Sequence, residues 1–152
     1  MLRERACEQL PARELRLPAR ATKLALARHY ARTAAAACGF AEDACYELSV
    51  AVNEAVTNAI RHGKPDAEGN IRVSVHADAR SLTVAVRDFG TFSAGRAAGA
   101  DGAAAGSAPA GGAARAGAEG GRGFAMMAAL MDAVQLCVSS GSTTVRLCKA
   151  RP

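Results

Sequence analysis

The sequence predicts an α/β (α+β) two-layer sandwich, in which a mixed, mostly antiparallel sheet is covered on one face by about three helices. Two pairs of segments alternate apolar and polar residues, and each pair is joined by a few polar residues, which predicts two β-hairpins. Two segments before the first hairpin and one between the hairpins instead repeat apolar residues at helical spacing. Hairpins with helices between them are typical of helices packed on one face of a sheet.

The first half of the chain predicts one strand, two helices and one hairpin. Residues 14–17 are typical of a strand, which Pro18 closes. An alanine-rich helix is expected over 19–37, with one face formed by Leu26, Tyr30 and Ala34. A second helix is expected over 41–62, with an apolar stripe at Leu48, Ala51, Val52, Ala55 and Ala59. The hairpin then has alternating strands around 71–77 and 82–86.

A low-complexity stretch separates this half from the rest of the chain. Of the 28 residues from 93 to 120, 21 are Ala or Gly, and none is Leu, Ile, Val, Met or aromatic. Such a segment cannot bury enough apolar surface to offset its ordering entropy. We therefore expect 93–120 to be a flexible lid within a single domain spanning 1–152. A short helix over 122–131 and strands over 134–138 and 143–148 follow it.

Several classes of protein are excluded by the sequence. No apolar run approaches the roughly 18 to 20 residues that span a bilayer, and residues 1–17 lack the apolar core of a secretory signal. The five cysteines are an odd number and include no Cys-x-x-Cys pair, which disfavours a zinc site. We expect reduced thiols in a cytoplasmic protein with no membrane partner.

The net charge of +5 is concentrated at the N-terminus. Residues 1–32 hold eight Lys or Arg and three Asp or Glu, whereas 33–152 hold eleven of each. A nucleic-acid surface usually has a denser basic stripe with stacking aromatic residues. The pattern therefore favours a solvated face or an acidic protein partner over direct nucleic-acid binding.

Three groups of residues are candidates for chemistry. Glu54 and Asn58 lie one helical turn apart, so an amide ligand for Mg²⁺ and a carboxylate base would share a surface; an ordinary solvated helix face has the same pattern. Asp88 and Gly90 end a strand, where a carboxylate accepts from an amine, although a plain turn uses these residues too. The third group is Gly121, Arg122 and Gly123, which begin a helix. Their N–H groups would form a phosphate cradle, although glycines that simply end a flexible loop have the same pattern.

The order of these motifs resembles that of the GHKL (Bergerat-fold) ATPases, which carry a histidine-kinase-like ATPase domain, and specifically the bacterial anti-sigma-factor serine/threonine protein kinases. Residues 47–63 are similar to the N box of that family, 86–90 to its first glycine box, and 119–132 to its second. Residues 142–145, Ser-Thr-Thr-Val, are similar to a Gly-Thr-Thr-Val near the family's C-terminus.

The resemblance implies a role for each candidate residue. Asn58 would bind the Mg²⁺ that bridges the ATP phosphates, and Glu54 would be the general base. Asp88 would accept a hydrogen bond from the adenine amine, with Gly90 beside the ring. Gly121 and Gly123 would hold the lid hinge and the phosphates. Either Thr143 or Thr144 would lie near the adenine side of the pocket.

For the whole chain, the resemblance implies an ATP-dependent serine/threonine kinase that acts as an anti-sigma factor. It would sequester a sigma factor and phosphorylate an anti-sigma-factor antagonist, and a homodimer is compatible with it. Because 93–120 consists mostly of Ala and Gly, an alternative stays open. The chain would then be a regulatory module of the same fold that binds ATP or a partner without catalysis.

Overall fold

The computed structural model describes residues 13–90 and 118–152. The chain forms β1 (Arg13–Pro18), a 3₁₀ turn η1 (Ala21–Lys23), α2 (Leu24–Ala37), α3 (Glu42–His62), β2 (Asn70–Ala77) and β3 (Ser81–Asp88). After a segment outside the described residues come α6 (Ala118–Leu130), β4 (Ala133–Ser139) and β5 (Ser142–Ala150). The predicted lid lies mostly in that segment, so its conformation stays a prediction.

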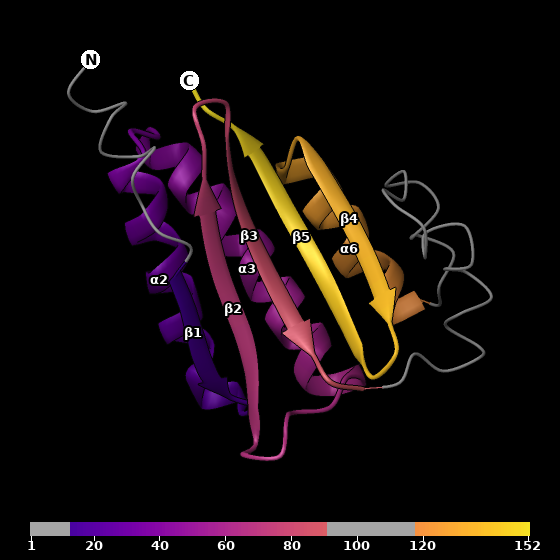
Figure 1. Cartoon of the computed structure of the whole chain (residues 1–152). Coiled ribbons are helices and arrows are strands. Elements are labelled where there is room, and N and C mark those ends of the chain that lie inside the picture. Colours follow the sequence, from indigo (N-terminus) through magenta and orange to yellow (C-terminus); the bar gives the residue numbers. More distant parts are fainter. Residues whose placement is uncertain (1–12, 91–117) are drawn as a thin grey trace.

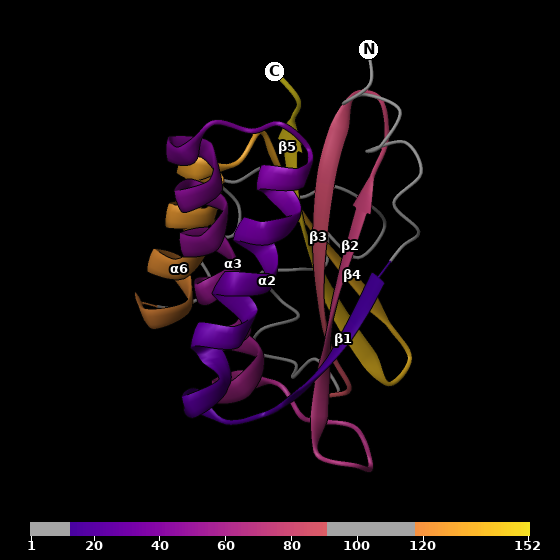
Figure 2. The same cartoon turned by 90° about the vertical axis from the view of Figure 1, so that its left-hand side faces the viewer.

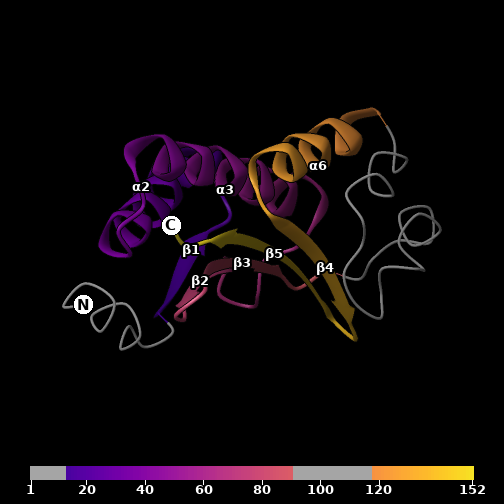
Figure 3. The same ribbon diagram turned by 90° about the horizontal axis from the view of Figure 1, so that it is seen from above.

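The five strands form one sheet in the order β1-β2-β3-β5-β4 (Figure 1). All four pairings are antiparallel, so the predicted sheet is confirmed but contains no parallel pair among the described strands. The three helices form a single layer on one face of this sheet (Figures 2 and 3). The predicted two-layer architecture is therefore confirmed.

The core lies between the helix layer and the sheet. The predicted stripe of α3 is buried as expected, and Val56 joins it. The expected face of α2 was wrong: Leu26 is 44% exposed, and the buried residues are Ala27, Ala31 and Ala35. Alanine has no side chain beyond Cβ, so this face lets α2 approach α3 closely.

The helix limits differ from the predicted ones at two N-termini. A 3₁₀ turn precedes α2, which begins at Leu24 rather than at residue 19. Helix α6 begins at Ala118, four residues before the predicted start, so the glycines at 120, 121 and 123 lie within it. The sequence disfavours this start because each glycine in a helix costs about 1 kcal/mol relative to alanine.

Two further expectations concern membranes and thiols. Within residues 13–90 and 118–152, no helix is long and apolar enough to cross a membrane. Cys45, Cys137 and Cys148 are free thiols, as expected. Cys38 is disulfide-bonded, so the prediction of reduced thiols is wrong at that position.

Candidate active site

Helix α3 carries the first pair of candidate residues in its C-terminal half. The helix is favoured by acidic residues in its first turn, Glu42 and Asp43, and by Arg61 and His62 in its last turn, which match the helix dipole. Its apolar stripe packs on the sheet and leaves Glu54 and Asn58 on another face, where both are half-buried.

Helix α6 covers this pair through Gly123. A Cβ atom built on Gly123 would lie 3.1 Å from Asn58 Nδ2 and 3.2 Å from Glu54 Oε2. Only a glycine fits here without displacing one of these side chains, so Glu54, Asn58 and Gly123 are brought together as the motif order predicted. Asn58 Nδ2 is buried and has no hydrogen-bond partner among the described residues. A buried donor without a partner is costly, which is typical of a site that a polar ligand completes.

The second candidate pair lies at the end of β3. Asp88 is 7% exposed, and its Oδ1 accepts a hydrogen bond of 2.9 Å from the Gly90 N–H. The Phe89 N–H donates to the Lys64 carbonyl oxygen at 2.7 Å, which ties the strand end to the second residue after α3. This places Asp88 beside the C-terminal end of α3.

Gly63 makes this close approach possible, although its sequence context indicates only the end of a helix. A Cβ atom at this position would lie 2.4 Å from Asp88 Cγ and 2.6 Å from the Ala59 carbonyl oxygen. Its backbone is extended, with φ −94°, so a glycine is required for space rather than for conformation. The neighbouring pattern His-Gly-Lys-Pro gave no signal beyond helix termination.

The two threonines of β5 point to opposite faces of the sheet. Thr143 is the register partner of Asp88 and is buried on the helix side. Thr144 pairs with Arg87 and faces away from the helices, because side chains alternate along a strand. Of the two alternatives, the structure therefore brings Thr143, and not Thr144, to Asp88.

The phosphate-cradle residues lie in the first turns of α6. Only the first four N–H groups of a helix lack an intrahelical acceptor, and in α6 these end at Gly121. The N–H groups of Arg122 and Gly123 therefore belong to the helix interior in this conformation. The side chain of Arg122 lies outside the described side chains.

The C-terminal end of α6 is anchored by contacts that the sequence did not reveal. Lys149 Nζ donates to Glu47 Oε2 at 2.7 Å and to the Leu130 carbonyl oxygen at 2.9 Å, so it joins β5 to α3 and α6. Asp132 Oδ2 accepts a 2.6 Å hydrogen bond from the Ala150 N–H. These contacts fix the end of the helix that is remote from Gly123.

Glu54, Asn58 and Gly123 thus lie together between α3 and α6, and Asp88 lies beside the end of the same helix at Gly63. We call these two neighbouring groups the α3–α6 site. Its donor set fits Mg²⁺ bound mainly by phosphates, because Mg²⁺ commonly takes only one or two protein ligands. Among the described residues there is no cluster of three His, Cys, Asp or Glu that would hold a metal by itself.

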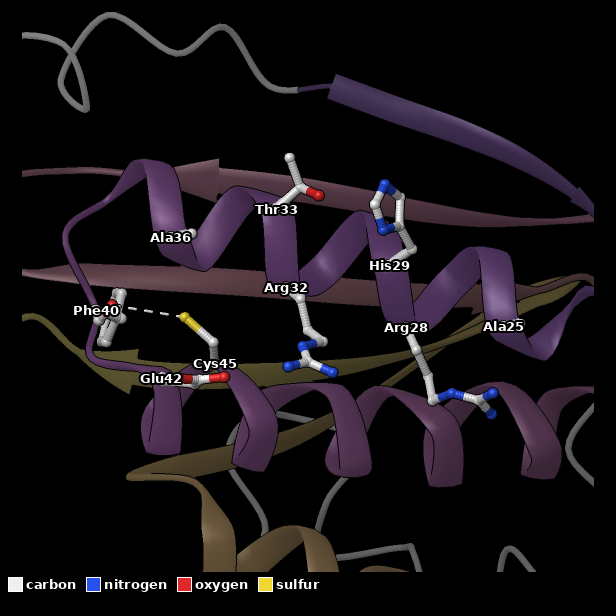
Figure 4. A pocket seen from close by; sticks show the side chains of 9 residues that line it. All are labelled: Ala25, Arg28, His29, Arg32, Thr33, Ala36, Phe40, Glu42 and Cys45. Atoms are coloured by element: carbon white, nitrogen blue, oxygen red, sulfur yellow. Dashed lines mark hydrogen bonds between the residues drawn. The ribbon is translucent and has the colours of Figure 1, made fainter.

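A separate groove of about 530 Å³ lies between α2 and the start of α3 (Figure 4). We call it the α2 groove. Arg28 and Arg32 extend across it from α2 toward α3, and Arg28 Nη1 donates to Asn53 Oδ1 at 2.7 Å. Burial raises the pKa of the Cys45 thiol, whose S–H donates to the Phe40 carbonyl oxygen at 3.6 Å. The groove does not include any residue of the α3–α6 site.

The sequence also matches a known protein family. Residues 17–149 match the model of the histidine kinase-like ATPase domain. The chain belongs to this family. The predicted resemblance is therefore confirmed, over nearly all of the described residues.

Relatives within the family include serine-protein kinases. The chain is 37% identical over 78 residues to serine-protein kinase RsbW of Listeria innocua, and 35% identical over 80 residues to that of Listeria monocytogenes. Each match covers 51% of this chain and 50% of the relative, so the chain matches only half the length of these kinases.

Two solved structures share the fold. The RsbU and RsbW domains of a Mycobacterium tuberculosis protein match 93% of this chain and 33% of theirs, with a TM-score of 0.63 and 20% identity. The SiaB–SiaC complex of Pseudomonas aeruginosa has a chain that matches 95% of this one and 90% of its own length, with a TM-score of 0.59 and 13% identity. At these identities they support the fold alone.

Proposed function

We propose that this chain is an ATP·Mg²⁺-dependent protein kinase that acts as an anti-sigma factor. It phosphorylates a serine or threonine of an anti-sigma-factor antagonist and sequesters a sigma factor. The observation that carries the proposal is that Gly123 of α6 lies against Glu54 and Asn58 of α3, with Asp88 beside the end of the same helix. The histidine kinase-like ATPase family supports ATP as the nucleotide, and the serine-protein kinase relatives support a protein hydroxyl as the acceptor.

Each residue of the site has a role in this proposal. Asp88 accepts a hydrogen bond from the adenine amine, and Gly63 and Gly90 leave room beside it. Asn58 Oδ1 is the protein ligand for Mg²⁺, and Glu54 takes the proton from the attacking hydroxyl. Bound ATP·Mg²⁺ supplies the phosphoryl group and the charge that stabilises its transfer. Gly121, Arg122 and Gly123 are proposed to contact the phosphates, and Thr143 the adenine side.

A second candidate function is a regulatory module that binds ATP or a partner without catalysis. One observation favours it: even a Cβ atom at Gly123 would crowd Glu54 and Asn58, and the N–H groups of Arg122 and Gly123 lie inside the helix. For phosphoryl transfer, the start of α6 must move away from Glu54 to admit the phosphates.

The α2 groove supports a protein partner rather than nucleic acid. From Leu15 to Ala41 the chain contains no Asp or Glu, whereas Arg28 and Arg32 line the groove. The other wall contributes Glu42, a carboxylate that disfavours a phosphate backbone. We propose that the sigma factor or its antagonist binds there, and that the protein works in the cytoplasm, with a homodimer as its possible assembly.

The decisive experiment separates ATP binding from transfer. Purified protein, γ-labelled ATP and a candidate antagonist are combined, and the Glu54→Gln variant is compared with the Glu68→Gln variant. Glu68 is an exposed loop residue, so its replacement removes the same charge away from the site. A kinase requires that Glu54→Gln loses at least about a hundredfold in transfer while it keeps ATP binding, since a general base contributes about 10²–10⁴-fold.

Two results would argue against a kinase. Unchanged transfer in Glu54→Gln refutes the base role, and no transfer by the unmodified protein despite ATP binding favours the regulatory module. Loss of ATP binding in Asn58→Ala only when Mg²⁺ is present would support the metal role.

A further inference from the structure

The face of the sheet turned away from the helices carries four arginines, and no described segment covers it (Figures 2 and 3). Register and alternation place one arginine from each of four strands on this face: Arg16 (β1), Arg72 (β2), Arg87 (β3) and Arg146 (β5). We call them the basic sheet face. We propose that this face is a docking surface for an acidic segment of a partner protein.

The arginines lie close to one another across the strands. Arg16 is directly opposite Arg72, and Arg72 is directly opposite Arg87. Arg87 of β3 pairs with Thr144 of β5, and Arg146 lies two residues further along β5. Arg146 is therefore the diagonal neighbour of Arg87. Like charges directly opposite each other destabilise a sheet. Carboxylates at Arg72 reduce this repulsion from within the chain, and an anionic partner would neutralise the other arginines.

Two of these guanidinium groups are held in place by an aromatic ring. Arg72 lies 5.1 Å and Arg87 5.0 Å from the centre of the Phe89 ring, within the range of cation–π contacts. Arg72 also forms ion pairs with Glu14 at 3.6 Å and with Asp66 at 3.8 Å. Arg72 is therefore already neutralised, whereas Arg87 is positioned by Phe89 and pairs with no carboxylate among the described residues.

In the part of the chain that the structure describes, the other cations of this face also lack a carboxylate partner. Within the described residues, the side chains of Arg16, Arg87 and Arg146 form no ion pair or hydrogen bond. Glu14 is the one acidic residue that the described strands place on this face. Three unpaired guanidinium groups within one surface match carboxylates, which an arginine fork binds through two parallel hydrogen bonds.

The shape of the face also suits a polypeptide. Between the arginines lie small side chains, Ser74, Ala85 and Thr144, and all three are half-buried by their neighbours. Because these side chains are short, few groups protrude from the middle of this face. An extended or helical segment can therefore lie on it with its carboxylates at the arginines.

Other occupants fit the face less well. A second copy of this chain related by a two-fold axis would place the same arginines against each other, which is repulsive. Single-stranded nucleic acid binds chiefly by stacking bases on aromatic rings. The aromatic residue that contacts these arginines is Phe89, and its ring is engaged by Arg72 and Arg87.

The proposal does not depend on kinase activity. Asp88 and Thr143 face the α3–α6 site, whereas their neighbours Arg87 and Thr144 belong to the opposite face. Failure of phosphoryl transfer would therefore leave the docking proposal intact, and loss of docking would leave ATP binding intact.

The test uses the full chain labelled with ¹⁵N and a synthetic peptide of eight glutamates as the probe. We expect the peptide to shift the amide signals around Arg16, Arg87 and Arg146 more than those of α2. We expect Arg87→Gln/Arg146→Gln to weaken peptide binding about tenfold, because each exposed ion pair contributes a factor of roughly two to five. Arg80→Gln is the control, because it removes one positive charge from the hairpin between β2 and β3, outside this face. We expect it to change peptide binding less than twofold.

A second variant tests the competing basic surface. Arg28→Gln/Arg32→Gln removes the same charge from the α2 groove, so a greater loss of binding in this variant than in Arg87→Gln/Arg146→Gln overturns the proposal. It is also overturned if an octameric oligothymidylate binds the sheet face more tightly than the peptide at the same salt concentration, or if the chain dimerises through this face. Peptide shifts confined to the basic sheet face, together with the tenfold loss, support it.

Discussion

Replacing Gly63 by alanine tests whether space at the end of α3 keeps Asp88 in place. The new Cβ would lie 2.4 Å from Asp88 Cγ and 2.7 Å from its Oδ1, roughly 1 Å closer than ordinary contact allows. Overpacking of this kind costs about 1–3 kcal/mol, and loss of the hydrogen bond from the Gly90 N–H adds about 1 kcal/mol. The lower entropy of the unfolded chain returns about 0.4–1 kcal/mol.

The net expectation for Gly63→Ala is a loss of about 2 kcal/mol in the free energy of unfolding, measured by urea denaturation. If Asp88 binds adenine, ATP affinity measured by calorimetry should fall about tenfold or more, because a hydrogen bond to a charged group is lost. The control is the same change in an Asp88→Ala background, where the carboxylate atoms are absent. The clash with the Ala59 carbonyl oxygen remains there, so we expect about half of the stability cost to persist.

Two results would refute this reasoning. The first is a Gly63→Ala variant that unfolds at the same urea concentration as the parent and keeps its ATP affinity. The second is an equal stability cost in both backgrounds, which would show that the Asp88 carboxylate is not the obstacle.

Three further predictions address the packing and charges that position the site. Lys149→Met should lower the free energy of unfolding by about 1–2 kcal/mol, because the Leu130 carbonyl loses a charged donor; a smaller effect than that of Glu47→Gln in urea denaturation would contradict this. Ala31→Leu should cost about 1–3 kcal/mol in the same assay by overpacking the buried contact of α2 with α3, whereas the exposed Ala25→Leu should stay within about 0.5 kcal/mol. The Arg80 and Ser81 N–H groups hold the pKa of Asp78 below its usual 3.8, so its stabilising effect is present above that pH and is lost as the pH falls below it. Melting temperatures measured from pH 5 to pH 2 should therefore fall less steeply for Asp78→Asn, and an unchanged slope would count against this role.

The sequence was most informative where one physical signal dominated. Helix α3 has strong apolar periodicity and charges that match its dipole, and its limits were predicted to within one residue. The strands were found from alternation, and the β2–β3 hairpin from the few polar residues between them, where the Asp78 carboxylate accepts from two N–H groups of the turn.

The predictions failed where packing outweighed local preference. In α2, Leu26 has the larger apolar side chain, yet Ala31 and its neighbours are buried because close helix approach needs small residues. In α6, glycines predict a late start, but the helix includes them, and Gly123 lies against α3 where a Cβ atom would crowd Glu54 and Asn58. Gly63 was missed because its role is to leave room for a residue 25 positions away, and no local pattern records such a distance.

The basic sheet face shows why a count of charges along the chain is a poor guide to a surface. Residues 33–152 are neutral by count, which made the N-terminal region look like the sole basic feature. The sheet register nevertheless collects Arg72, Arg87 and Arg146 from this neutral part and adds Arg16 beside them. The balancing carboxylates lie elsewhere, as Glu54 and Asp88 do in the α3–α6 site. Because strand side chains alternate, consecutive residues such as Arg87 and Asp88 have opposite charges and opposite surroundings, so their charges cancel in the sequence count and not at either surface.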